Sequence, residues 1–406
     1  MPAKKALEGL RVADFTWWGV GPYVTRLFGA MGAQIIRVES LNRIDPIRTS
    51  PPFKPGQWGI NLSGYWNNFN PCKLSITLNL SLPKGVEIAK RLIMISDIVA
   101  DNFTPRVMPK LGLGYEELLK MKPSLVILSM PVMGRGGPRT NFVAYGQQIA
   151  GLAGVNSISG FPGHPPSGTG NALSDFAINP YQGATALLAA LHHRNKTGEG
   201  QFIELAQYEA TTCVLETAIL DYTMNNRIQG PNANRLPYAA PHGVYRCKGE
   251  ERWCVIAVFT DEEWRSFCQV IGNPDCAQDE KFATLLARKK NEDELDRLVE
   301  EWTGERIPEE VMALMQQAGV AAGVVQNMED LMVKDPQMKA REFYQVREHP
   351  EIGTVTYDGL QYKFSATPGE IWRAPLMGEH SEYVYRELLA MSDEEIEQCA
   401  AEGVFE

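Results

Sequence analysis

Residues 10–39 carry the strongest constraint on the fold. Leu10–Thr16 predicts a strand, the residues from Gly19 predict a turn, and Tyr23–Met31 predicts a helix. Gly32–Glu39, which contains an Ile-Ile pair and a Val, predicts a second strand. Two neighbouring strands joined through a helix run parallel, because that crossover returns the chain to the same end of the sheet. The sequence therefore predicts an α/β fold with a parallel sheet.

The same alternation continues along the next part of the chain. Pro83–Ser96 predicts a helix, and three later apolar runs predict strands at Asp97–Asp101, Leu125–Met130 and Gln201–Leu205. Residues 45–70 are rich in Pro, Gly and Asn and have no clear period, so we expect a long loop there.

The pattern changes after about residue 226. His242–Lys248 and Arg252–Val258 predict two antiparallel strands, Asp261–Ile271 predicts a helix, and charged helical runs follow to about Gln317. This change predicts a second, smaller α+β domain.

The glycine turn after the first strand is similar to a dinucleotide-binding fingerprint. Glu39 lies where an acid that binds a ribose is expected, but the third glycine of the fingerprint is replaced by Val24 and Pro22 interrupts the run. An oxidoreductase that uses a nicotinamide cofactor is therefore only a lower-ranked alternative.

The overall charge and the cysteines limit the class of protein further. The chain has 406 residues and a formal net charge of −10, which disfavours nucleic-acid binding. Its seven cysteines show no CxxC spacing, which argues against a zinc site or a disulfide framework and favours a reducing compartment. No apolar run has the length of a membrane span. We expect a cytoplasmic protein that does not bind membranes.

Asp175 precedes the most helix-like stretch of the sequence. Asn179 is a suitable N-cap, Pro180 suits the first helical position, and Gly198 ends the helix. A carboxylate just before a helix N-terminus is favoured by the helix dipole, and it can attack an activated acyl group. An Asp in such a loop also commonly serves only to tighten a turn.

Several motifs elsewhere in the chain indicate its family independently of Asp175. The run from Leu188 to Gly200 contains Ala-Ala-Leu, two His and Lys-Thr-Gly-Glu-Gly; Gly9–Thr16 reads Gly-Leu-Arg-Val-Ala-Asp-Phe-Thr; and the runs starting at Asn70 and Asn102 contain Lys-Leu-Ser-Ile and Asn-Phe-Thr-Pro. Together they resemble class III CoA-transferases, the group that includes formyl-CoA, carnitine and benzylsuccinate CoA-transferases. The resemblance covers nearly the entire chain.

The resemblance implies a particular architecture. Family members have a Rossmann-like large domain formed by both chain ends and a smaller α+β middle domain, and two chains interlock as a dimer. Applied here, the large domain comprises residues 1–225 and 331–406, and the small domain comprises residues 226–330. The expected assembly is a homodimer or a heteromer with a homologous subunit.

The resemblance also implies functional residues. Asp175 is the expected catalytic nucleophile. The residues expected to bind CoA are Trp18, Gly19, Val20, Arg37, Lys73, Asn102, Phe103, Lys110 and Tyr145. Arg37 is expected at the nucleotide end, Lys73 is the expected CoA-contacting lysine, and Lys110 is expected to face a phosphate. Asn102 and Phe103 are expected along the pantetheine and adenine. Two residues depart from the family pattern: Gly19 replaces a polar residue, and Gly146 replaces a carboxylate that often follows the aromatic Tyr145.

The implied reaction moves CoA from an acyl-CoA donor, for example succinyl-CoA, to a free carboxylic acid. It proceeds through an aspartyl mixed anhydride and an aspartyl-CoA thioester, and needs neither metal nor NAD. Trp17, Trp18 and Tyr145, with the stiff segment Leu236–Pro241, favour a partly apolar acceptor, aromatic or dicarboxylic, over formate or oxalate.

Two alternatives share the fold. A 2-methylacyl-CoA racemase keeps the aspartate but pairs it with a His, and Ala144–Gly146, the matching segment, contains none. The chain is alternatively a weakly catalytic subunit of a heteromeric CoA-transferase.

Overall fold

The computed structural model describes residues 5–406. Six strands form one sheet in the order β3-β2-β1-β4-β5-β6. Their bounds are β1 (Arg11–Asp14), β2 (Gln34–Glu39), β3 (Leu74–Thr77), β4 (Ile98–Asp101), β5 (Val126–Ser129) and β6 (Gln201–Glu204). Every neighbouring pair is parallel, which confirms the predicted parallel sheet.

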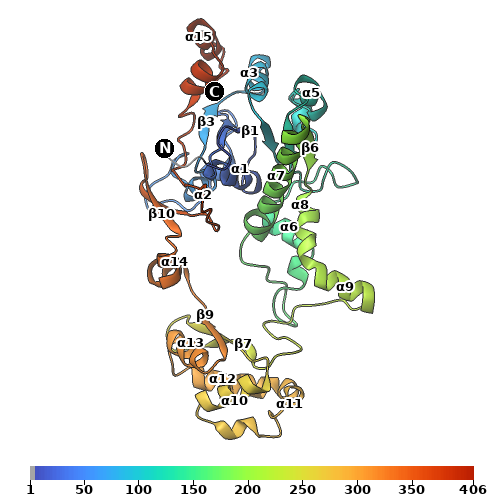
Figure 1. Cartoon of the computed structure of the whole chain (residues 1–406), viewed down its shortest axis with the longest axis vertical. Helices are drawn as coiled ribbons and strands as arrows, with labels where there is room; N and C mark the ends of the chain where they lie inside the picture. Colours follow the sequence, from blue (N-terminus) through green and yellow to red (C-terminus); the bar gives the residue numbers. More distant parts are fainter. Residues whose placement is uncertain (1–4) are drawn as a thin grey trace. The chain divides into compact units, whose positions relative to one another are not determined.

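Helices bury both faces of this sheet, because successive residues of a strand point to opposite sides. Val12 of β1 belongs to the apolar cluster that contains residues of α1 (Val20–Ala30) and α7 (Asn179–Thr197). The next residue, Ala13, belongs to the cluster on the other face, with residues of α3 (Pro83–Met94) (Figure 1). The sheet is therefore doubly wound.

The chain forms two compact units. The larger unit combines the chain up to Ser157 with Gly168–Gln229 and Gln337–Glu406, and the smaller unit combines Ile158–Ser167 with Gly230–Pro336. The sequence analysis assigned residues 158–167 to the large domain. The structure assigns them to the smaller unit, where the Gly160 carbonyl accepts a hydrogen bond of 3.0 Å from the Ala233 N–H.

The larger unit contains further helices and one antiparallel strand pair. They are η1 (Pro46–Thr49), α2 (Gly64–Phe69), α4 (Val107–Lys110), α5 (Tyr115–Met121), α6 (Gly146–Leu152), η2 (Val155–Ser157), η3 (Ser174–Ile178), α8 (Gln207–Thr212), η4 (Cys213–Leu215), α9 (Glu216–Asn225), α14 (Pro336–Ala340), the antiparallel pair β10 (Tyr344–His349) and β11 (Gly353–Asp358), η7 (Tyr383–Leu388) and α15 (Asp393–Ala401). Helix α14 is grouped with them, although its first residue, Pro336, belongs to the smaller unit.

The expectation of a long loop over residues 45–70 holds for residues 50–63 and is wrong on either side of them. This segment contains the 3-10 helix η1 and the helix α2. Asp45 accepts a hydrogen bond from the Ile47 N–H at the start of η1, and Ser63 accepts one from the Trp66 N–H at the start of α2. These polar caps start short helices that have too few turns to show a hydrophobic period.

The smaller unit contains an antiparallel sheet in the order β7-β8-β9. Its elements are β7 (His242–Arg246), β8 (Trp253–Ala257), α10 (Asp261–Val270), η5 (Pro274–Ala277), α11 (Leu285–Lys290), α12 (Glu292–Thr303), α13 (Pro308–Gln317), β9 (Ala321–Val324) and η6 (Asp330–Lys334). The antiparallel pairing of β7 with β8 confirms the two strands predicted there.

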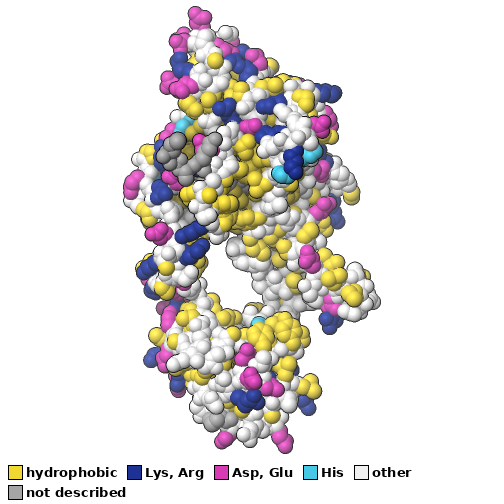
Figure 2. Space-filling view, viewed as in Figure 1, with side chains coloured by type: hydrophobic (Ala, Val, Ile, Leu, Met, Phe, Trp, Pro, Cys, Tyr) yellow, Lys and Arg dark blue, Asp and Glu magenta, His cyan; other side chains and the backbone are white. Residues whose placement is uncertain are grey.

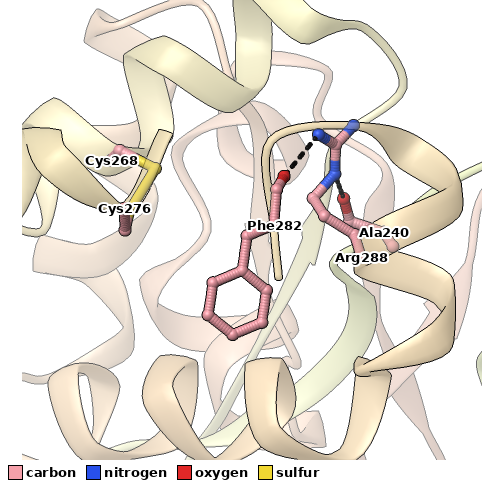
Figure 3. Close-up of a disulfide and its surroundings, with 5 residues drawn as sticks. All are labelled: Ala240, Cys268, Cys276, Phe282 and Arg288. Carbon is pink, nitrogen blue, oxygen red and sulfur yellow. Dashed lines mark hydrogen bonds between the residues drawn. A yellow bond between two sulfur atoms is a disulfide. The ribbon is translucent and has the colours of Figure 1, made fainter. Parts of the chain in front are cut away.

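Within the smaller unit, Cys268 and Cys276 form a disulfide (Figure 3). The sequence analysis expected no disulfide framework, and this pair differs from that expectation. The chain reverses between α10 and η5 and so brings the two sulfurs together, but an eight-residue spacing carries no local signal. Close by, the buried Arg288 donates hydrogen bonds to the carbonyls of Ala240 at 2.8 Å and Phe282 at 3.2 Å (Figure 3).

None of the helices in residues 5–406 combines the length and the apolarity needed to cross a bilayer. Over the same residues, no three His, Cys, Asp or Glu side chains are grouped so that they could hold a metal ion.

A cluster of buried charges joins β1, β2 and β3. Asp14, at the end of β1, forms ion pairs with Lys73 at 3.0 Å and with Arg37 at 3.4 Å. Arg37 also pairs with Asp45 at 2.6 Å. Burial acts to raise the pKa of Asp14, but Lys73 and Arg37 hold it below the ordinary value, and burial lowers the pKa of Lys73 to about 8. The cluster therefore depends on each charge having its partner.

Asp14→Asn is expected to destabilise the protein strongly, because it leaves Lys73 and Arg37 buried beside a neutral amide. Removing one partner of a buried ion pair costs roughly 3–5 kcal/mol. Urea unfolding followed by circular dichroism measures the loss. Glu117→Gln, which removes a partly exposed ion pair with Lys90, is the control, and we expect it to cost less than about 1 kcal/mol. Equal effects of the two substitutions would contradict this prediction.

Candidate active site

A cavity of about 790 Å³ lies at the carboxyl ends of the sheet strands in the larger unit. It is lined by Trp17–Val20 after β1, Ser40 and Arg43 after β2, and Asn102–Thr104 after β4. The chain leaves the central strands β1 and β4 in opposite directions across the sheet, and such a switch point is where open α/β sheets bind ligands. The fold alone therefore indicates a binding site here.

Asp175 lines this cavity from the π-helix η3. The expectation that Asn179 caps the following helix is wrong, because η3 runs directly into α7 and Asn179 is a buried residue inside the helical stretch. Asp175 thus sits in a wide first turn, and not in a preceding loop. Gly198 ends α7 in the left-handed conformation, with φ of 81°, as predicted.

Two glycines allow the backbone to approach the Asp175 carboxyl group closely. The Gly146 N–H donates a hydrogen bond of 3.2 Å to Asp175 Oδ2. A Cβ atom at position 146 would lie 2.7 Å from Asp175 Cγ, and one at position 19 would lie 3.3 Å from Asp175 Cβ. The absence of a side chain at Gly146, where the family pattern often has a carboxylate, is what makes room for the Asp175 carboxyl group.

The environment of Asp175 tunes its protonation. Burial raises the pKa of Asp175 to about 6, and the hydrogen bond from Gly146 acts in the opposite direction. The carboxylate is therefore ionised near pH 7, yet it is more basic than an ordinary Asp. Both properties suit a nucleophile.

Aromatic side chains form much of the cavity wall. The rings of Trp18 and Tyr145 are 4.9 Å apart, and those of Trp17 and Phe103 are 5.8 Å apart in an edge-to-face arrangement. Trp17 is additionally held by Asn102, which accepts from its N–H at 2.7 Å and donates to its carbonyl at 2.8 Å. The wall is thus both apolar and firmly held.

Positive charge gathers where this cavity meets a second one of about 850 Å³. Arg43 and Arg106 line both cavities, and Lys110 lines the second. The Arg43 guanidinium lies 5.3 Å from the centre of the Trp17 ring. Three cations beside an aromatic channel fit an anionic ligand with an apolar arm.

Comparison with known proteins agrees with this geometry. A family model described as CoA-transferase family III matches residues 7–381. The chain belongs to this family. The resemblance stated from the sequence motifs is therefore confirmed.

Two relatives of this family III chain match it over nearly their full length. It is 29% identical over 405 residues to succinyl-CoA–D-citramalate CoA-transferase of Chloroflexus aurantiacus, covering 98% of each protein. It is 32% identical over 394 residues to succinate–glutarate CoA-transferase of Agrobacterium fabrum, covering 96% of this chain and 97% of the relative. A CAIB/BAIF family protein from Brucella suis has a crystal structure with a TM-score of 0.87, at 29% identity, covering 95% of this chain and 100% of the other.

Most residues that the sequence analysis assigned to the family III site lie together. The cavity lining includes Trp18, Gly19, Val20, Asn102, Phe103, Tyr145 and Asp175. Lys110 lies in the adjoining cavity. Arg37 and Lys73 do not line either cavity: both are fully buried in the ion cluster around Asp14, so their charges face other protein groups in place of the predicted CoA contacts.

The sequence analysis missed Arg43 and left Trp17 without a fixed role. Arg43 follows β2 in a segment with no motif, so only its position at the carboxyl edge of the sheet identifies it. A search of every loop that leaves the carboxyl edge of the sheet would have included it.

Gly146→Ala is expected to lower the activity of this CoA-transferase family member about 10²-fold, because the new methyl group displaces the Asp175 carboxyl group and its N–H donor. Gly151→Ala, in the same helix, is the matched control: its nearest contact would be an ordinary 3.6 Å. Acyl-CoA-dependent activity and thermal unfolding are measured for both. Full activity of Gly146→Ala would contradict the tight approach described above.

Proposed function

We propose that this protein transfers CoA from an acyl-CoA donor such as succinyl-CoA to a carboxylic acid, with Asp175 as the nucleophile. The observation that carries the proposal is the ionisable Asp175 carboxyl group at the wall of the cavity, with a backbone N–H donor at 3.2 Å. Family membership supports the same reaction class.

The proposed chemistry passes through two kinds of covalent intermediate. Asp175 attacks the thioester carbonyl of the donor, which gives an aspartyl mixed anhydride and releases CoA thiolate. The thiolate then attacks the Asp175 carbonyl, which releases the first acid and leaves an aspartyl-CoA thioester. The incoming acid reverses both steps, so the energy of the thioester is kept throughout. The Gly146 N–H is suited to stabilise the negative charge that develops on the Asp175 oxygen.

CoA is a suitable ligand for the cavity because it combines an apolar arm with phosphates. We assign the arm to the wall formed by Trp18, Gly19, Val20, Phe103 and Tyr145. We assign the phosphates to Arg43, Arg106 and Lys110, and we leave Arg37 and Lys73 out because they are buried in ion pairs.

The acceptor is proposed to be a dicarboxylic or partly apolar acid. The names of the two relatives, from Chloroflexus aurantiacus and Agrobacterium fabrum, refer to citramalate and glutarate, and both refer to a succinyl group or succinate. The Trp18–Tyr145 ring pair near Asp175 favours an acid with carbon chain or ring surface over formate or oxalate.

The alternative of a racemase is less well supported by the site. Such a reaction needs a second proton-transfer group, and the described residues that line the cavity include no His. Glu39, the other carboxylate of the lining, is already bound by Arg48 at 2.7 Å. A weakly catalytic subunit is disfavoured because Asp175 is retained and lines the cavity.

Incubation with succinyl-CoA is expected to place CoA on the peptide that contains Asp175, detectable by mass spectrometry after rapid quenching. Asp175→Ala is expected to lose both the adduct and at least about 10⁴-fold in transfer rate, since the covalent route needs the carboxylate. Detection of full activity in the Asp175→Ala protein would overturn the mechanism.

The rate should depend on pH through Asp175. Because only the carboxylate attacks, kcat/KM is expected to fall about tenfold per pH unit below a midpoint near 6. A folded pKa above the unfolded value means that ionisation opposes folding, so Asp175→Asn should stabilise the protein at pH 8, by up to about 3 kcal/mol, and not at pH 4. A midpoint near 4 in the rate profile would contradict this assignment.

We also propose that the chain works with a partner subunit, a second copy or a homologue. Figure 2 shows hydrophobic side chains on the surface of the larger unit in the region of α9. The exposed apolar residues in and around α9 are Val214, Ile219, Leu220, Tyr222, Met224 and Ile228. A patch of this kind is typical of a subunit interface.

Light scattering of the purified chain is expected to give a mass near twice 45.2 kDa. The double substitution Leu220→Glu and Met224→Glu should raise the monomer fraction, because it places charge on the apolar patch. Leu286→Glu, at an equally exposed apolar position in α11, should not. A stable monomer of the unsubstituted chain at micromolar concentration, in the absence of any co-purifying homologue, would argue against the proposal.

A further inference from the structure

The turn Trp17–Gly19 is the part of the cavity wall whose backbone is most constrained. Trp18 has φ of 59°, in the left-handed region that a bulky residue rarely adopts. Non-glycine residues in that region persist only where surrounding groups hold them, and they are frequent at functional sites. Gly19, the next residue, lies directly against Asp175. The conformation of this turn therefore sets the space beside the nucleophile.

Two side chains hold the turn by hydrogen bonds to its backbone. Asn102 binds both the N–H and the carbonyl of Trp17. Asp45 accepts from the Trp18 N–H with both carboxyl oxygens, at 3.3 and 3.2 Å. The Trp18 N–H is thus satisfied in a conformation that would otherwise be unfavourable.

Asp45 is itself fixed by Arg37. The ion pair between them is 2.6 Å long, and their side chains are 1% and 0% exposed. Arg37 additionally donates to the Thr16 hydroxyl at 2.9 Å, and Thr16 immediately precedes the turn. The Arg37 guanidinium therefore binds both Thr16, the residue before the turn, and Asp45, the carboxylate that accepts from the Trp18 N–H.

We propose that Arg37 and Asp45 are positioning residues for the transfer reaction, which hold Trp18 and Gly19 in register with Asp175. The expected loss of kcat rests on the proposed function. The inference that Arg37 and Asp45 hold the turn does not. It gives Arg37 a role different from the CoA contact that the sequence motifs imply.

The kinetic test separates a positioning role from a binding role. Arg37→Lys and Asp45→Asn are assayed by the exchange of labelled succinate into succinyl-CoA, and CoA binding is measured by calorimetry. We expect kcat to fall about 10²-fold, since a small displacement beside a reacting group has that effect. The Kd for CoA should stay within about threefold of the wild-type value. A weaker Kd with unchanged kcat would overturn the inference in favour of a CoA ligand.

A matched control excludes a purely structural explanation. Asp330, in the smaller unit, is also a buried carboxylate that accepts from a guanidinium, Arg252, and from a backbone N–H, that of Asn327. Asp330→Asn should reduce stability without the selective loss of kcat. Equal kcat losses in Asp330→Asn and Asp45→Asn would overturn the inference.

A milder variant covers the case in which the two substitutions prevent folding. Thr16→Val removes one hydrogen bond of Arg37 and one of Asp14 and leaves both charges with their ion-pair partners. Its kcat is expected to fall about threefold to tenfold at unchanged CoA affinity. A kcat equal to that of the wild type would overturn the inference.

Hydrogen exchange tests the turn without any assay of activity. Exchange of the Trp18 amide, followed by mass spectrometry on a peptide that spans the turn, should be at least about tenfold faster in Asp45→Asn and unchanged in Asp330→Asn. Unchanged protection in Asp45→Asn would overturn the inference. Absence of succinate exchange in the wild-type protein would instead contradict the proposed function, and the protection of Trp18 would still decide whether Asp45 holds the turn.

Discussion

The contact of Asp14 with Arg37 and Lys73 is the interaction on which the larger unit depends. Moving three charges out of water costs several kcal/mol per ion, so the arrangement is stable only while every charge is paired. Asp14, Arg37 and Lys73 come from β1, β2 and the residue before β3, and their pairing fixes three neighbouring strands at one edge of the sheet. Trp17, which lines the cavity, follows Asp14 by three residues.

The Asp175 carboxyl group shows the opposite balance. It has no ion-pair partner among the described contacts, and the one hydrogen bond that it accepts there comes from the Gly146 N–H. Full neutralisation by a cation would lower its basicity, whereas complete burial without a donor would keep it protonated near neutral pH. Its position between these limits results from burial, which raises the pKa, and from the Gly146 N–H, which lowers it. Gly146 can donate at this distance because no side chain stands in between.

Local patterns predicted the elements that carry strong periodicity and missed those that do not. Except for β3 (Leu74–Thr77), which was not predicted, the strands of the parallel sheet and the end of α7 at Gly198 agree with the sequence analysis. The helix α2 and the π-helix η3 do not, because the first is shorter than two turns and the second continues directly into α7. Motif similarity found Asp175 and the aromatic wall, but it read Arg37 and Lys73 as ligands. A buried cation and an exposed one look the same in a linear motif.

The sequence by itself determined the fold class and the family and singled out Asp175 as the candidate nucleophile, because these follow from periodicity and from residue types at fixed spacing. Tertiary structure decided which cations face the cavity and which neutralise Asp14, since that depends on burial and not on order in the chain. It also decided that Gly146 supplies the hydrogen bond to Asp175. Those two residues are separated by a long stretch of chain, and only the packing of α6 beside η3 brings a backbone N–H to the carboxyl group.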